Sequence, residues 1–74
     1  MDSLEKAIEK FRKQEPKMFQ KGVNEGIECY IKGYSDLQVH NYYFYNSLGN
    51  ENEKALYYGV IEGFEKAKKE DLKN

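Results

Sequence analysis

The side chains with the most versatile chemistry in this chain are one cysteine, Cys29, and one histidine, His40. A zinc site needs about four ligands, and neither a C-x-x-C pair nor a second histidine is present to supply them. A di-iron bundle needs two Glu-x-x-His motifs, which a single histidine does not provide. We therefore expect no metal site.

A nucleophile–base pair of Cys29 and His40 would need an orienting third group and an oxyanion hole around a substrate pocket. A chain of 74 residues has no room for such a pocket. Neither glycine-rich phosphate loop, G-x-x-x-x-G-K-[ST] or G-x-G-x-x-G, occurs in it. We expect a non-enzymatic protein without a cofactor, in which Cys29 and His40 have structural roles.

Side chains suited to contacting another protein are concentrated in the middle of the chain. Five of the seven tyrosines lie between residues 30 and 45, and residues 22–53 contain five acidic residues and one basic residue. Tyrosine offers a large amphipathic contact area while only two χ angles are fixed. We predict a partner-binding set of Val39, Tyr42, Tyr43, Tyr58, Ile61, Glu25 and Glu28. The alternative is that some of these tyrosines line a loose core.

Apolar spacing predicts that helices carry these residues. In residues 2–14 the apolar positions recur at i, i+3, i+4 and i+7, and Asp2 with Glu5 has the spacing of a capping box. Pro16 ends this first helix and opens the second, which we expect to continue to about Tyr34.

The segment 35–48 has two interpretations. Ser35 and Gln38 form a capping box for a helix, whereas residues 39–45 are rich in strand-favouring types. A helix with Leu37, Phe44 and Leu48 facing inward points Val39, Tyr42 and Tyr43 outward. Gly49 then ends the element.

The fourth segment begins near Asn50 or Asn52 and extends to about Leu72. With Leu56, Val60 and Ala67 facing inward, Tyr58 and Ile61 point outward. A helix that is apolar on two faces of so small a protein indicates a contact surface.

Residues 22–32 and 59–69 form a weak internal repeat at an offset of 37. The identical pairs are Gly22/Gly59, Val23/Val60, Glu25/Glu62, Gly26/Gly63, Glu28/Glu65 and Lys32/Lys69. The expected fold is an all-α bundle of three to four helices, in which residues 1–74 form one domain of two stacked αα-hairpins.

The four repeated glycines, Gly22, Gly26, Gly59 and Gly63, are predicted to be helix-packing residues. Each costs about 0.8–1 kcal/mol relative to alanine inside a helix, so close approach of another backbone must offset the cost. The ridges of small residues could meet within one chain, across a homodimer, or in a groove that receives a partner.

Charge, hydropathy and cysteine content indicate where the protein is located. The chain carries a net charge of −1, and it has no apolar run of the roughly 18 residues that a membrane span needs. A single cysteine fits a cytoplasmic location, because it forms no internal disulfide.

We expect a homodimeric, protein-binding inhibitor or adaptor of the phage or mobile-element type. Its acidic, tyrosine-rich surface would complement a basic groove, such as that of a nucleic-acid enzyme. The alternative is a small dimeric nucleic-acid-binding regulator. Its contacts would come from Lys6, Lys10, Arg12, Lys13, Lys17 and Lys21.

Overall fold

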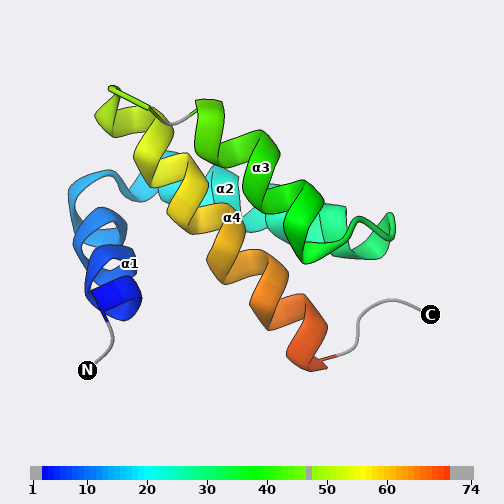
Figure 1. Cartoon of the computed structure of the whole chain (residues 1–74). Helices are drawn as coiled ribbons and strands as arrows, with labels where there is room; N and C mark the ends of the chain where they lie inside the picture. Colours follow the sequence, from blue (N-terminus) through cyan, green and yellow to red (C-terminus); the bar gives the residue numbers. More distant parts are fainter. Residues whose placement is uncertain (1–2, 47, 71–74) are drawn as a thin grey trace.

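Four helices account for nearly all of the described residues, 3–46 and 48–70, of the computed structural model (Figure 1). They are α1 (Ser3–Gln14), α2 (Pro16–Ile31), α3 (Asp36–Asn46) and α4 (Glu51–Glu70). The predicted all-α fold is confirmed, and the ambiguous third segment is a helix, not a strand. Within these residues, no helix combines the length and apolar character required to traverse a bilayer.

Local side-chain signals set most helix ends. The capping box of α3 is present: Gln38 Oε1 accepts from the Ser35 backbone N–H at 2.9 Å, and Ser35 Oγ accepts from that of Gln38 at 3.2 Å. Asn50, not Asn52, caps α4 by accepting from the Asn52 and Glu53 backbone N–H groups. The predicted cap at Asp2 and helix end at Leu72 lie outside the described residues.

Helix α2 ends earlier than the predicted Tyr34, because the chain turns at a glycine. Gly33 has a φ of 90°, and its N–H donates to the Tyr30 carbonyl while the Tyr34 N–H donates to that of Cys29. This pair of bonds is a Schellman motif, which reverses the chain direction and directs it into α3.

The largest interface by far joins α2 and α4, which cross while running in the same general direction (Figure 1). A methyl group on Gly22 would overlap the Leu56 carbonyl oxygen and lie 3.0 Å from Gly59 Cα. A methyl group on Gly26 would overlap the Val60 carbonyl oxygen. The two glycine ridges therefore meet within the chain, at backbone contact distance.

This contact is reciprocal. Each of the four glycines directs a Cα–H bond at a backbone carbonyl of the other helix, a recurrent weak hydrogen bond. The pairs are Gly22 with Leu56, Gly26 with Val60, Gly59 with Phe19, and Gly63 with Val23. When each residue is replaced by its counterpart 37 positions away, the Gly22–Leu56 pair becomes Gly59–Phe19, and the Gly26–Val60 pair becomes Gly63–Val23. The sequence repeat is thus also a structural one, with α2 and α4 as equivalent halves.

The apolar core lies on two sides of this crossing. One cluster, against α1, contains Ile8, Phe11, Phe19 and Ala55, with Met18, Val23, Tyr58 and Ile61 packed on it. The other cluster, against α3, contains Cys29, Val39, Val60 and Phe64, with Tyr30 and Tyr43 packed on it. Each outer helix therefore covers one side of the α2–α4 pair.

The predicted orientation of α3 is wrong for Val39, Leu37 and Phe44, although Tyr42 is exposed as predicted. Val39, expected to face outward, is only 6% exposed, whereas Leu37, expected to face inward, is 68% exposed. Phe44 and Leu48 are also exposed. The helix is rotated because it seats Val39 against α2 and α4 and ties His40 Nδ1 to the Tyr57 hydroxyl at 2.9 Å.

The outward placement of Tyr58 and Ile61 on α4 is wrong as well. Both side chains are partly buried, and Tyr58 stacks on Phe11 with ring centroids 5.3 Å apart. Helix α1 covers this face of α4, so the second apolar face of α4 belongs to the core.

We predict that replacing Gly26 with alanine destabilises the fold, although alanine is normally the better helix former. The added methyl group would meet the α4 backbone, which moves only if the helices separate, so we expect a loss of about 2 kcal/mol or more. Thermal unfolding followed by circular dichroism measures it. Gly49→Ala is the matched control: it introduces strain at a φ of 80° in open space and should cost about 1 kcal/mol. Equal melting temperatures for the two variants would contradict the close-packing account.

Candidate functional site

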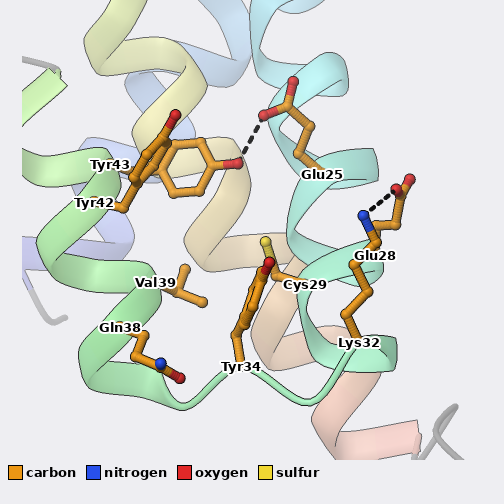
Figure 2. A pocket seen from close by; sticks show the side chains of 9 residues that line it. All are labelled: Glu25, Glu28, Cys29, Lys32, Tyr34, Gln38, Val39, Tyr42 and Tyr43. Carbon is orange, nitrogen blue, oxygen red and sulfur yellow. Dashed lines mark hydrogen bonds and ion pairs between the residues drawn. The ribbon is translucent and has the colours of Figure 1, made fainter.

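A half-open groove of about 540 Å³ lies between α2 and α3 (Figure 2). Its lining combines carboxylates, tyrosines and a small apolar floor. The lining residues are Glu25, Glu28, Cys29, Lys32, Tyr34, Gln38, Val39, Tyr42 and Tyr43. Its volume falls within the range typical of ligand sites, about 300–1,000 Å³.

The α2 side of the groove carries the charged groups. Glu25, Glu28 and Lys32 follow one another at helical spacing, so they lie along one edge of α2 (Figure 2). Lys32 Nζ lies 3.3 Å from Glu28 Oε1, and both side chains are more than half exposed. Glu25 Oε1 accepts a hydrogen bond of 2.9 Å from the Tyr43 hydroxyl. The Glu25 carboxylate is thus held by the Tyr43 hydroxyl, which reaches across the groove. The Glu28 carboxylate is held by an exposed ion pair with Lys32.

The floor consists of Cys29 from α2 and Val39 from α3, both buried. Burial raises the pKa of the Cys29 thiol, and the nearby Glu25 carboxylate contributes in the same direction. Burial, together with the hydrogen bond to Glu25, raises the pKa of the Tyr43 hydroxyl well above its ordinary range. Both groups are therefore neutral at physiological pH, and Cys29 has little of the thiolate character of a nucleophile.

Two exposed tyrosines stand at the edges of the groove. Tyr42 is 66% exposed and packs edge-to-face on Tyr43 with ring centroids 5.0 Å apart. Tyr34 follows Gly33, is 49% exposed, and rises between the two helices near Val39 and Cys29 (Figure 2). The groove therefore offers aromatic surface at its α3 side and at its lower end.

The structure brings five of the seven predicted partner-binding residues to this groove: Glu25, Glu28, Val39, Tyr42 and Tyr43. Val39 belongs to its floor, not to an outward surface. Tyr58 and Ile61 lie elsewhere, in the cluster against α1. Gly22, Gly26, Gly59 and Gly63 are buried at the α2–α4 crossing, so their ridges are already occupied within the chain.

Four lining residues were missing from the predicted set: Cys29, Lys32, Tyr34 and Gln38. Cys29 follows Glu25 by four residues, and Lys32 at the end of α2 follows Glu28 by four, and this spacing is a usable signal. Tyr34 and Gln38 enter the groove only because the chain reverses at Gly33, which the helix periodicity does not specify.

A second, smaller hollow of about 300 Å³ lies on the other side of α3. It is mainly apolar and is lined by Leu4, Asp36, Val39, His40, Tyr57, Val60, Ile61, Phe64 and Glu65. Val39 therefore lines both hollows, one on each side of α3. In the part of the chain that the structure describes, no three histidine, cysteine or acidic side chains converge as metal ligands would.

The basic residues of α1 are partly neutralised by acidic neighbours. Arg12 lies 3.2 Å from Glu9 and 3.8 Å from Glu62 of α4, and Lys13 lies 3.7 Å from Glu9. Two of the six basic residues predicted for nucleic-acid contact are thus engaged within the protein.

Comparison with known proteins gives no match: no protein-family model, no curated protein and no solved structure is similar to this chain. The geometry of the groove is therefore the basis for assigning a function.

We predict that the free energy of unfolding decreases as the pH rises past about 9. A raised pKa in the folded protein means that the unfolded chain releases the proton at lower pH, so deprotonation favours unfolding. The contributions of Cys29 and Tyr43 are fully present below the ordinary thiol pKa of 9.0 and are lost at higher pH. Urea titrations at about pH 7 and pH 10 measure this change.

Tyr43→Phe should reduce the alkaline loss, because it removes one of the groups whose pKa burial raises; the Tyr57 hydroxyl is another. Tyr42→Phe removes a hydroxyl from the exposed neighbour and should behave like the unchanged protein. A free energy of unfolding that is the same at both pH values would contradict the predicted role of the buried groups.

Proposed function

We propose that this protein is a non-enzymatic protein-binding domain that acts as an inhibitor or adaptor through the groove between α2 and α3. The observation that carries the proposal is the combination of exposed Tyr42 and Tyr34 with the carboxylates of Glu25 and Glu28 around one groove. Aromatic side chains are the anchors that most often dominate protein interfaces, and flanking carboxylates select a partner surface by charge.

The electrostatics support a basic partner surface. Residues 22–53, which include both sides of the groove, carry five acidic residues and one basic residue. Such a surface attracts a basic groove of another protein and repels phosphate. A nucleic-acid enzyme, whose own substrate groove is basic, is one class of target. A cytoplasmic location and an origin in a phage or mobile element belong to the same proposal.

The competing proposal, a dimeric nucleic-acid regulator that uses α1, is weaker. Arg12 is already engaged by Glu9 and Glu62, and the chain contains no other arginine with which to read bases. Nucleic-acid binding also has a distinct signature, a steep loss of affinity with salt.

Self-association remains part of the proposal, through α3 and not through the glycine ridges. Leu37, Tyr42 and Leu48 expose apolar surface on or next to α3, and a second copy is one way to cover it. Light scattering after size exclusion at micromolar concentration tests this, with a mass of twice 8.8 kDa as the expected result. A monomer would leave the protein-binding proposal in place and remove the homodimer.

We predict that Tyr42→Ala lowers partner recovery about tenfold or more in affinity capture from lysate of the source organism or its host. The reason is that truncation removes the most exposed aromatic side chain of the groove without replacing a buried residue. Mass spectrometry identifies and quantifies what is retained at low and high salt.

Ile31→Ala is the matched control, since Ile31 is half exposed at the end of α2 but does not line the groove. It should leave recovery unchanged. Equal recovery by the two variants, or recovery of duplex DNA alone in a salt-sensitive manner, would overturn the proposal.

A further inference from the structure

The two halves of the fold use equivalent glutamates in different ways. Glu25 and Glu62 occupy the same position of the repeat, and each reaches the outer helix on its own side of the α2–α4 crossing. On the α1 side, Glu62 faces the Arg12 guanidinium at 3.8 Å. On the α3 side, Glu25 faces the neutral Tyr43 hydroxyl.

The α1 side is a filled arginine site. The Arg12 guanidinium lies 5.7 Å from the centroid of the Phe19 ring, 3.2 Å from Glu9 and 3.8 Å from Glu62. An aromatic face combined with carboxylates is the environment that a planar guanidinium favours, because it stacks on the ring while donating hydrogen bonds at its edge.

The groove on the α3 side offers the same chemistry without an arginine of the chain. Glu25 and Glu28 supply carboxylates along one side, and Tyr34, Tyr42 and Tyr43 supply aromatic surface opposite and at the ends (Figure 2). Among the described residues, Lys32 is the one basic residue in the lining, and its Nζ lies 3.3 Å from Glu28 Oε1.

We propose that the groove between α2 and α3 binds an arginine side chain of a partner protein, held between the Glu28 carboxylate and the tyrosine rings. The proposal rests on the protein-binding function above and names the chemistry of its ligand. Lys32 is then an internal competitor, which an incoming guanidinium displaces from Glu28. Arginine is preferred to lysine because only its planar group combines stacking with bidentate hydrogen bonding.

The test is an NMR titration of the isotope-labelled full chain with the peptide acetyl-Gly-Leu-Arg-Leu-Gly-amide. The comparison peptides carry citrulline, which has the same shape without charge, or lysine at the central position. We expect the arginine peptide to shift the amide signals of Glu28, Tyr34 and Tyr42, and to bind about fivefold more tightly than either comparison peptide.

Two variants should change the affinity for the arginine peptide in opposite directions. Glu28→Gln should weaken binding of the arginine peptide about fivefold, whereas Lys32→Gln should strengthen it about threefold by removing the competitor. The controls are Glu9→Gln and Lys13→Gln, which break an ion pair of the same i, i+4 spacing on α1. They should leave peptide affinity unchanged.

Equal affinity for the arginine and citrulline peptides, or shifts centred on α1, would overturn the arginine site. So would weaker binding in Lys32→Gln. These outcomes differ from a failure of the protein-binding function itself. If Tyr42→Ala still lowers partner recovery while no peptide binds, the function stands and only the arginine ligand is wrong.

Discussion

The rest of the fold depends on the backbone contact between α2 and α4. Four glycines inside helices cost about 3–4 kcal/mol in helix propensity, which is comparable with the whole stability that so small a core provides. The compensation is that Gly22 and Gly59 meet at their Cα atoms, and that four Cα–H groups face carbonyls across the crossing. Dispersion contacts between two backbones at this distance are dense, since no side chain intervenes.

This contact also determines where the core lies. Because no side chain separates α2 from α4, apolar side chains pack beside the crossing and not within it. Two separate clusters result, one under α1 and one under α3. Helix α3 buries Val39, packs Tyr43 beside it and sets Phe44 edge-on to Tyr57 of α4. Polar contacts complete the attachment, including the Tyr43–Glu25 bond and the Lys68–Asp36 pair at 3.0 Å. A helix held in this way leaves hollows on both of its flanks, and the larger one is the candidate site.

Sequence reasoning succeeded where the signal is local or repeated. The capping box at Ser35 and the proline at the start of α2 depend on neighbouring residues, so the helices could be placed from the sequence. The repeated G-V-x-E-G segments identified the packing glycines, although only the structure shows that the ridges meet within one chain. The orientation of α3 was wrong because apolar residues surround that helix, and Val39 and Leu37 compete for the inward position. The choice depends on tertiary contacts with Val60 and Phe64, which no pattern within α3 encodes.

The asymmetry between the two sides of the crossing explains why the candidate site lies beside α3. On the α1 side, an arginine pairs with the repeated glutamate and lies over the Phe19 ring. On the α3 side, a tyrosine binds the equivalent glutamate without neutralising it, and Tyr42 and Tyr34 stay exposed nearby. A carboxylate fixed in place by a neutral donor keeps its charge available to an incoming cation. Near-symmetry of the backbone combined with this difference in side chains thus leaves the repeated glutamate paired with a cation on one side and with a neutral hydroxyl on the other.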